Sequence, residues 1–284
     1  MSEQRFLKGI RWQASRLNRW RRNRRLSAVG RAPISVLVFH RIADDRANAW
    51  TTPTHDFQQA IHWLKSRFDM ISLAETQARL CNGSHRPAVA ITFDDGYAEN
   101  CETALPLLIA ERIPCTYFVC TEPVLEGTPF AHDRTTAKLL KPNSVEQLRA
   151  MAEAGVEIGA HSRTHPDFGR ITDPATLHDE MVAARDDLAA AIGRPVRRFA
   201  FPFGCPENLT SAAFRLAREA GYDAVLTCYG GYNMPGNDPF HLQRRSAEGS
   251  LMRIRNWTSF DPRHDRRVRR WVAEAHWSPY ADAS

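Results

Sequence analysis

The 284-residue sequence has no apolar run long enough to cross a membrane and no low-complexity segment. A membrane-spanning helix needs roughly 20 consecutive, mostly apolar residues, and a secretory signal needs an apolar stretch of about 7 to 15 residues near its start. Neither is present, so we expect a globular protein with a cytoplasmic location. With 43% apolar residues, the chain can bury one large core as a single domain.

Paired cysteines are also missing, because the six cysteines include no CxxC motif. Their neighbours resemble those of strands and helices and not those of a small, loop-rich secreted scaffold. The sequence therefore predicts reduced cysteines that pack in the interior, and it excludes a disulfide-stapled fold.

Acidic residues are scarce at the start of the chain. Residues 1–31 hold ten Lys and Arg against the single acid Glu3, while the whole chain has a net charge of +6, so the remaining residues sum to −3. Apolar residues recur in this arm at helical spacing: Leu7, Ile10, Ala14 and Leu17. Two interpretations stay open, a basic helix in contact with an anionic membrane surface, or a helix packed on the domain with a solvated charged face. We expect no nucleic-acid partner, since no recognisable nucleic-acid module accompanies the charge.

Strand-like and helix-like segments alternate after the arm, which is typical of a parallel sheet closed into a barrel. Strands are predicted at 34–39, 88–93, 115–120, 156–159, 199–203 and 224–227, and helices at 54–67, 98–112, 144–155, 173–192 and 211–220. The predicted organisation is an arm at 1–31, one α/β barrel at 32–262 and a C-terminal extension at 263–284.

Two short motifs carry residues that bind metals. Asp94 and Asp95 follow the predicted strand 88–93, and His161 and His165 follow the strand 156–159. A catalytic zinc site normally has three protein ligands and leaves a position open for water. Asp95, His161 and His165 can supply the three ligands, which leaves Asp94 free to accept a proton from the water.

Each motif has a simpler interpretation when it is considered alone. An Asp-Asp-Gly sequence after a strand is usually a solvated turn, and histidine pairs at this spacing occur on many surfaces. His40, after the strand 34–39, would by itself be a core or rim histidine. However, reacting groups in parallel barrels stand at the carboxyl ends of strands, and the two motifs and His40 all fall there.

These motifs resemble those of NodB-homology polysaccharide deacetylases, a carbohydrate esterase family with a distorted (β/α) barrel. The resemblance runs from about Ile34 to Phe260. It implies that Asp94, in Thr92–Gly96, is the catalytic base and that Asp95 binds the metal. It likewise implies that His161 and His165 are the other two metal ligands.

The third family motif is similar to Phe199–Gly204, but Ala200 stands where the family has an arginine that orients the base. Arg244 or Arg245 could replace that arginine if the fold brings one of them close. The resemblance implies that the apolar walls around the sugar include Phe201, Pro202 and Phe203.

The family's late Leu-x-x-His motif has no convincing match after residue 210, whereas Leu37–His40 fits it. This early position resembles the circularly permuted branch of the family, which includes poly-N-acetylglucosamine deacetylases. The resemblance implies that His40 is the general acid. We further expect that a backbone N–H near Tyr97 stabilises the developing negative charge, which makes Tyr97 a substrate-binding residue.

The expected function is metal-dependent removal of N-acetyl groups from an amino-sugar glycan. We expect one divalent ion, zinc in the first place, with cobalt, nickel and manganese as alternatives. The expected substrate is an acetylated glycan or a lipid-linked sugar, with peripheral contact of the arm with an anionic membrane. The alternative functions are deformylation or deacetylation of a lipid-linked sugar, O-acetyl ester hydrolysis, and a catalytically silent glycan-binding barrel.

Overall fold

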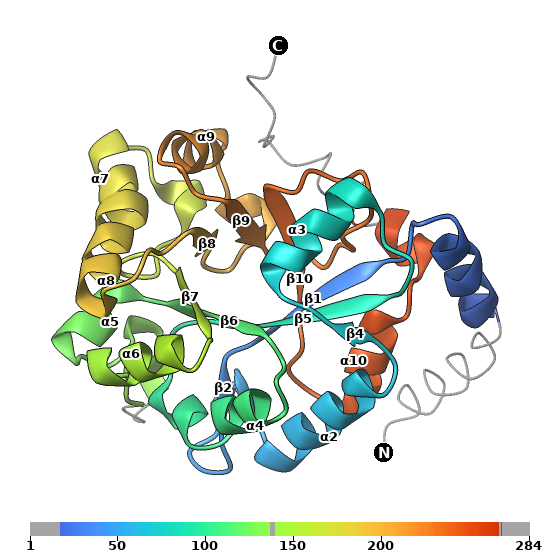
Figure 1. The fold of residues 1–284 in the computed structure, drawn as a ribbon. Coiled ribbons are helices and arrows are strands. Elements are labelled where there is room, and N and C mark those ends of the chain that lie inside the picture. The colour runs from blue at the N-terminus through green and yellow to red at the C-terminus, as the bar shows by residue number, and fades with distance from the viewer. Residues whose placement is uncertain (1–17, 137–139, 267, 269–284) are drawn as a thin grey trace.

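The structure, a computed structural model, describes residues 18–136, 140–266 and 268. Its centre is a closed barrel of seven parallel strands, with a short eighth strand paired to one of them (Figure 1). In barrel order the strands are β1 (Ile34–Phe39), β10 (His241–Ser246), β9 (Ala224–Thr227), β8 (Arg198–Ala200), β7 (Glu157–Ala160), β6 (Cys115–Val119) and β5 (Ala88–Phe93), which closes on β1. β4 (Asp69–Met70) pairs with β5, and β2 (Arg41–Ile42) pairs with β3 (Thr51–Thr52). The predicted distorted (β/α) barrel is confirmed.

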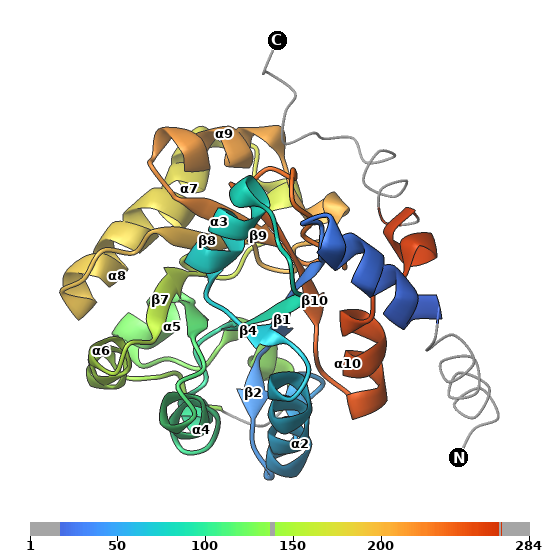
Figure 2. The same ribbon diagram turned by 45° about the vertical axis from the view of Figure 1, so that its right-hand side comes forward.

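Helices surround the barrel, as two views of the ribbon show (Figures 1 and 2). They are α2 (Thr54–Lys65), α3 (Leu73–Asn82), α4 (Ala104–Ala110), α5 (Thr121–Glu126), α6 (Val145–Glu153), α7 (Pro174–His178), α8 (Ala184–Ile192), α9 (Ser211–Glu219) and α10 (Leu251–Thr258). A further helix at 18–28 precedes the barrel and lies on the same side of the molecule as α10. The predicted capping box opens α6, with reciprocal hydrogen bonds between Ser144 and Gln147.

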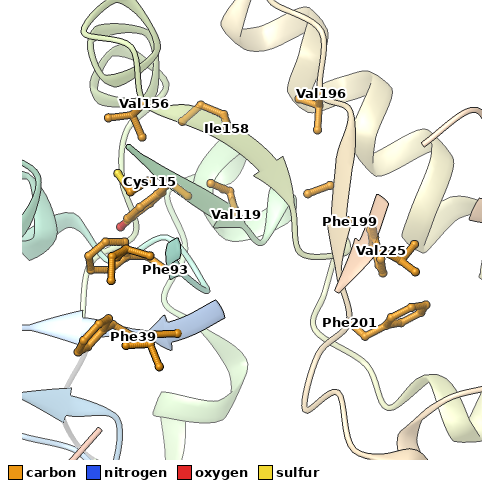
Figure 3. Close-up of a cluster of buried hydrophobic side chains, with 14 of the residues drawn as sticks. Phe39, Phe93, Cys115, Val119, Val156, Ile158, Val196, Phe199, Phe201 and Val225 are labelled. Atoms are coloured by element: carbon orange, nitrogen blue, oxygen red, sulfur yellow. The ribbon is translucent and has the colours of Figure 1, made fainter. Parts of the chain in front are cut away.

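Strand alternation separates an outer and an inner layer of side chains. On β5, Val89 and Ile91 face outward and pack against the helices, whereas Ala88 and Ala90 face the barrel interior. Figure 3 shows part of the outer layer, in which aromatic and branched side chains from neighbouring strands lie together. The same alternation decides which residues at the carboxyl ends of the strands turn into the barrel mouth.

Several predicted boundaries differ from the structure. The helix predicted at 98–112 is a 3₁₀ turn (Ala98–Cys101) followed by α4, and the helix at 173–192 is interrupted by a π-helical turn at Asp179–Ala183. The strand predicted at 199–203 ends at Ala200. Strand β10 and helix α3 were not predicted, because the sequence of β10 is polar and its burial comes from its place in the barrel.

All six cysteines are free thiols, but only Cys115 and Cys120 are buried. Cys81 is exposed and the other three are half-buried, so the predicted interior packing holds for two of the six. The predicted arm lies partly outside the described residues, and so do Leu7, Ile10, Ala14 and Leu17 and most of the extension at 263–284. Among the described residues, none of the helices has the length and apolarity that a membrane crossing requires.

Candidate active site

The predicted site residues come together at the carboxyl ends of the strands. Asp94 and Asp95 follow β5, His161 follows β7, and His40 follows β1. Three of them, Asp95 and the two histidines at 161 and 165, present ligand atoms that all lie within 4.8 Å of one another. Two segments far apart in the sequence thus converge because their parallel strands end on the same face of the barrel.

The donor set fits a divalent cation. The Asp95 Oδ1 atom lies 3.6 Å from His161 Nε2 and 3.5 Å from His165 Nε2, and it is buried without a hydrogen-bond partner among the described residues. His161 donates from Nδ1 to the backbone carbonyl of Ala200 at 2.7 Å. Nε2 is therefore unprotonated, and its lone pair faces Asp95. Three convergent O and N ligands of this kind suit zinc and related ions.

Burial sets the charges of these three side chains. It lowers the pKa of His161, and it lowers the pKa of His165 to about 4, so both imidazoles are neutral near pH 7. Burial by itself would raise the pKa of Asp95, but the neighbouring imidazoles, His132 first among them, outweigh it and lower that pKa. Neutral imidazoles beside an ionised carboxylate are the protonation states that metal binding requires.

The backbone at the site is strained. Asp95 (φ 72°), Ser162 (φ 69°), His165 (φ 65°) and Phe203 (φ 57°) all have left-handed conformations that residues other than glycine rarely adopt. Such conformations persist when the surroundings fix them. Here the Ser162 hydroxyl accepts a hydrogen bond from the His165 backbone N–H at 3.0 Å, and the Glu180 carboxylate accepts backbone N–H groups of the same loop. The loop therefore presents both histidines to Asp95.

Arg244 lies beside Asp94, where the third family motif would supply an arginine from the position of Ala200. Its two terminal nitrogens donate to the two oxygens of Asp94 at 2.6 and 2.8 Å. Burial would raise the pKa of Asp94, but the attraction of Arg244, with a further contribution from His161, lowers it. Arg244 reaches this position because Leu242 and Arg244 face the barrel interior on alternate positions of β10.

Arg245, the other candidate, points away from Asp94. It lies on the opposite face of β10, with its guanidinium 3.8 Å from the centre of the Tyr232 ring. Of the two possible replacements for the family's arginine, the structure therefore places Arg244, and not Arg245, beside the base.

His40 forms a close pair with a residue that the sequence did not indicate. Its Nδ1 lies 2.5 Å from Glu248 Oε1 and donates to this carboxylate, which leaves Nε2 for another partner. Burial alone would lower the pKa of His40, but the Glu248 carboxylate outweighs burial and raises it to about 9. His40 is therefore protonated near neutral pH. Glu248 follows the unpredicted strand β10, so no nearby motif indicated it.

The predicted substrate residues have different surroundings. Phe203 is 55% exposed, and its ring centre lies 5.0 Å from that of His165. Pro202 is buried beside it, at the same turn. Phe201 is fully buried against the rings of Phe168, Phe199 and Phe214, as Figure 3 shows for Phe199.

The assignment of the Phe201 side chain to substrate binding is thus corrected. Phe199 and Phe201 alternate with Ala200 and therefore belong to the outer layer, away from the barrel mouth. The Tyr97 side chain is fully buried and its hydroxyl donates to Asp133 at 2.8 Å, so only the backbone of Tyr97 could contact a substrate, as the prediction has it. The backbone N–H of Tyr97 makes no hydrogen bond to another described residue, so it remains a candidate donor.

His132 belongs to the site although nothing in the sequence separates it from the other histidines. Its Nε2 lies 3.0 Å from the Tyr97 hydroxyl and 3.5 Å from Asp95 Oδ2. Because the Tyr97 hydroxyl gives its one proton to Asp133, Nε2 of His132 must carry a proton and act as the donor. A protonated nitrogen cannot be a metal ligand, and His132 Nε2 approaches Asp95 at Oδ2, whereas His161 and His165 approach Oδ1.

A closed parallel barrel with an acid–histidine cluster at its mouth defines the class of protein: an α/β barrel with a hydrolase-like site. The sequence profile of the polysaccharide deacetylase family matches residues 82–225. The chain belongs to this family.

Individual relatives agree with this assignment. A chitooligosaccharide deacetylase from Bradyrhizobium sp. (strain ANU 289) is 33% identical over 140 residues, which cover 49% of this chain and 54% of the relative. YxkH from Bacillus subtilis (strain 168) is 22% identical over 199 residues, which cover 69% of this chain and 64% of YxkH. The chain spans less than two thirds of the length of these curated relatives.

Two solved structures share the fold. The chain is similar to IcaB from Ammonifex degensii, with a TM-score of 0.66, 22% identity and coverage of 80% of this chain and 97% of IcaB. It is also similar to the Streptococcus pyogenes deacetylase PplD, solved in complex with acetate, with a TM-score of 0.67, 21% identity and coverage of 81% of this chain and 100% of PplD.

Proposed function

We propose that the protein is a metal-dependent hydrolase that removes N-acetyl groups from an amino-sugar glycan. The observation that carries the proposal is one arrangement: three convergent ligands beside an unligated carboxylate that is held by an arginine. The ligand atoms of Asp95, His161 and His165 lie within 4.8 Å of one another. Asp94 lies beside them, and Arg244 donates a hydrogen bond to each of its two carboxylate oxygens. Its family and the names of its relatives support deacetylation as the reaction.

Asp95, His161 and His165 would hold the divalent ion, and zinc is the ion that we propose. A divalent ion in this place activates water for attack and stabilises negative charge on the substrate carbonyl oxygen. The tautomer of His161, fixed by the Ala200 carbonyl, keeps Nε2 available for this purpose.

Asp94 serves as the general base. With its pKa lowered, the carboxylate is ionised near neutral pH and can take a proton from the attacking water. Arg244 holds both oxygens of this carboxylate, so Asp94 keeps one orientation and does not swing onto the ion.

His40 serves as the general acid. The pair with Glu248 keeps the imidazole protonated, and it directs the free Nε2 edge away from Glu248. When the carbon–nitrogen bond of the acetamide breaks, His40 gives its Nε2 proton to the leaving amine. The products are acetate and a free amino group on the sugar.

Substrate contacts follow from the exposed groups around the ligands. The Tyr97 backbone N–H would donate to the carbonyl oxygen as negative charge develops on it. Phe203 offers an exposed aromatic face beside His165, and Pro202 adjoins it, so a sugar ring could pack there.

Acetate release from N-acetylated chitooligosaccharides tests the proposal. Asp94→Asn should abolish release and retain the metal, whereas His161→Ala should abolish release and lose the metal. Full activity of either variant would overturn the assignment. An exposed histidine away from the site, His178, provides the matched control, since His178→Ala should change neither quantity.

The alternatives differ in how well they suit the site. A silent glycan-binding barrel needs neither a base held by Arg244 nor a protonated His40, so the two pairs favour an enzyme. Hydrolysis of an O-acetyl ester uses the same groups, and parallel assays with O-acetylated and N-acetylated sugars separate the two reactions. Deformylation or deacetylation of a lipid-linked sugar stays a second candidate. It requires that the active site of the membrane-bound protein faces the bilayer, so the orientation of the protein on the membrane tests it.

We also propose that the protein binds an anionic membrane, peripherally and on the cytoplasmic face, through an arginine surface. This surface consists of Arg19, Arg21, Arg22, Arg24, Arg25, Arg67, Arg86, Arg255 and Arg263, which line two hollows of about 760 and 1170 Å³ on either side of the helix at 18–28. Trp20 and Val29 are 54% and 67% exposed at the same helix. Basic side chains with exposed apolar residues are typical of interfacial helices.

Co-sedimentation with vesicles tests the arginine surface. The variant with Arg21, Arg22 and Arg25 replaced by Gln should bind vesicles of phosphatidylcholine with phosphatidylglycerol more weakly than the unaltered protein. A control with three exposed arginines elsewhere, Arg112, Arg170 and Arg194, replaced by Gln should bind normally. The proposal would be contradicted if both variants lost vesicle binding equally, or if the protein bound vesicles of pure phosphatidylcholine. Tighter binding to nucleic acid than to vesicles would show that the arginine surface is a nucleic-acid site.

A further inference from the structure

A further hollow lies on the outer side of the barrel, at the carboxyl ends of β9 and β10. It has a volume of about 480 Å³ and is formed by residues that follow β9, by the end of β10, by α10 and by the segment after it. The lining residues are Cys228, Tyr229, Gly230, Arg245, Ser246, Arg253, Trp257, His264 and Val268. We call this hollow the Arg245 pocket. Because it adjoins the carboxyl ends of β9 and β10, it belongs to the same end of the barrel as the catalytic groups.

Arg245 in this pocket is a buried cation whose hydrogen-bonding capacity is mostly unused. The residue is 1% exposed, and its Nε donates to the Gly231 carbonyl at 3.1 Å. Neither terminal nitrogen, Nη1 nor Nη2, has a hydrogen-bond partner among the described residues. A buried polar group without a partner is costly, and such a group in a native protein calls for a ligand, an ion or water.

Aromatic rings fix the plane of this guanidinium. Its central carbon lies 3.8 Å from the centre of the Tyr232 ring and 4.9 Å from that of Trp257. Stacking occupies the faces of the group and leaves its N–H bonds to point outward in the plane. A planar fork of this kind matches the paired oxygens of a carboxylate or a phosphate.

The charge of the lining also suits an anion. Arg253 and His264 line the pocket with Arg245, and no Asp or Glu is among the lining residues in the described part of the chain. The nearest carboxylates that act on Arg245 are Asp265 and Asp261, which lie outside the lining. The Asp261 carboxylate accepts the backbone N–H of Arg263.

One side chain links the pocket to the proposed acid. Arg253 Nη2 lies 3.4 Å from the Ser246 hydroxyl, and Ser246 in turn donates to Glu248. Glu248 holds His40. A chain of hydrogen bonds through Ser246 and Glu248 therefore connects Arg253, at the Arg245 pocket, with His40. Neighbouring groups of one substrate could occupy the two places.

We propose that the Arg245 pocket binds an anionic group of the substrate, a carboxylate or phosphate carried next to the acetylated sugar. This proposal rests on the proposed function for the identity of the ligand as substrate. It adds that the preferred glycan is acidic, with the negative charge docked on Arg245 and Arg253 while the acetamide lies over the metal ligands.

Calorimetric titration with inorganic phosphate tests the pocket independently of catalysis. Arg245→Lys, which loses the planar fork, and Arg253→Gln should each weaken phosphate binding about tenfold or more. Arg194→Gln, an exposed arginine at the end of α8, is the control and should bind normally. Asp95→Asn should also bind normally, because it removes a metal ligand and leaves the pocket intact. Circular dichroism of each variant verifies the fold.

Three outcomes would overturn the pocket: no phosphate binding by the unaltered protein, unchanged binding in both pocket variants, or binding lost only in Asp95→Asn. For substrates, Arg253→Gln should raise KM for N-acetylated oligosaccharides that carry a carboxylate or a phosphate more than it raises KM for neutral ones. Comparison of the uronic acid and sugar phosphate substrates distinguishes the two sources of charge. An equal KM change for neutral substrates would contradict the binding of a substrate's anionic group in the pocket. If the protein releases no acetate from any substrate, the proposed function is wrong. The phosphate titration would still test the pocket in that case.

Discussion

Asp94 needs a partner that fixes its carboxylate and keeps it off the metal position, and Arg244 meets this need from a distant strand. Arg244 is 1% exposed and contacts both Asp94 oxygens. The arginine of the third family motif is absent at Ala200, yet the same function is available from β10, which runs beside β1. The arginine that pairs with the proposed base thus comes from β10 in this chain and not from the third family motif.

We expect Arg244→Met to lower the turnover of acetate release about 100-fold, because the base loses its orientation. Metal content should stay unchanged, since Asp95, His161 and His165 remain in place. Arg244→Lys is the informative comparison, because it keeps the charge and loses the bidentate contact. Measured kcat values and metal analysis of the three proteins test this prediction, and wild-type turnover in Arg244→Met would show that Asp94 is held by other groups.

The pair of His40 and Glu248 predicts a particular pH profile. His40 must be protonated to donate, so activity should fall as pH rises through its pKa of about 9. In Glu248→Gln the attraction that raises this pKa is gone, and the alkaline limb should move to lower pH. The same pair should stabilise the fold fully below pH 6.5, the ordinary pKa of a histidine side chain, and this contribution should be lost as pH rises through about 9.

Rate profiles for acetate release between neutral and alkaline pH provide the measurement for Glu248→Gln. Glu219→Gln, at an exposed position of α9, is the control. An alkaline limb at the same pH in Glu248→Gln and the unaltered protein would mean that His40 does not supply the proton.

At the scale of elements, the sequence predicted the strands whose apolar patterns are continuous and missed the one whose pattern is polar. β1 and β5 were predicted with their observed bounds, and five of the six side chains in each are apolar. β10 has the sequence His-Leu-Gln-Arg-Arg-Ser. It can be buried because Arg244 hydrogen-bonds to Asp94 and Arg245 packs against two aromatic rings. Those partners are distant in sequence, so no local pattern could indicate them.

The proposed metal-ligand residues could be identified because two short motifs carry them, but their geometry could not. The left-handed backbone at His165 belongs to a loop whose N–H groups donate to the Ser162 hydroxyl and the Glu180 carboxylate. His132 was missed for a related reason. It comes from a 3₁₀ segment (Ala131–Thr136), in which Asp133 accepts the Tyr97 hydroxyl and His132 lies near Asp95.

This 3₁₀ segment yields a prediction about metal affinity. His132→Ala removes the imidazole whose Nε2 lies 3.5 Å from Asp95 Oδ2, so we expect metal affinity to fall about 10- to 100-fold. At saturating metal, turnover should recover most of its normal value, because no ligand is lost. Competition with a chromogenic chelator measures the affinity, and His178→Ala is the control. Unchanged affinity in His132→Ala would show that Asp95 needs no support from this segment.

At the scale of the whole molecule, the barrel places two members of the arginine surface, Arg67 and Arg86, at the end opposite to the active site. Arg67 and Arg86 precede β4 and β5, whereas Asp94 and His40 follow β5 and β1. A six-residue strand spans roughly 20 Å, so the two regions are separated by the depth of the barrel. On a membrane that contacts Arg67 and Arg86, the active site would face away from the bilayer. This orientation favours a glycan in solution over a sugar linked to a lipid of the same bilayer.

The metal should also stabilise the molecule as a whole, because its ligands come from the ends of β5 and β7. A ligand that binds only the folded state at 100 times its dissociation constant adds about 2.7 kcal/mol to the free energy of unfolding. We therefore expect added zinc to raise the midpoint of thermal unfolding by several degrees relative to protein treated with a chelator. Asp95→Asn should lose this difference, whereas Asp94→Asn, which keeps all three ligands, should retain it. If zinc stabilises Asp95→Asn as much as it stabilises Asp94→Asn, the ion binds elsewhere and the three-residue site is wrong.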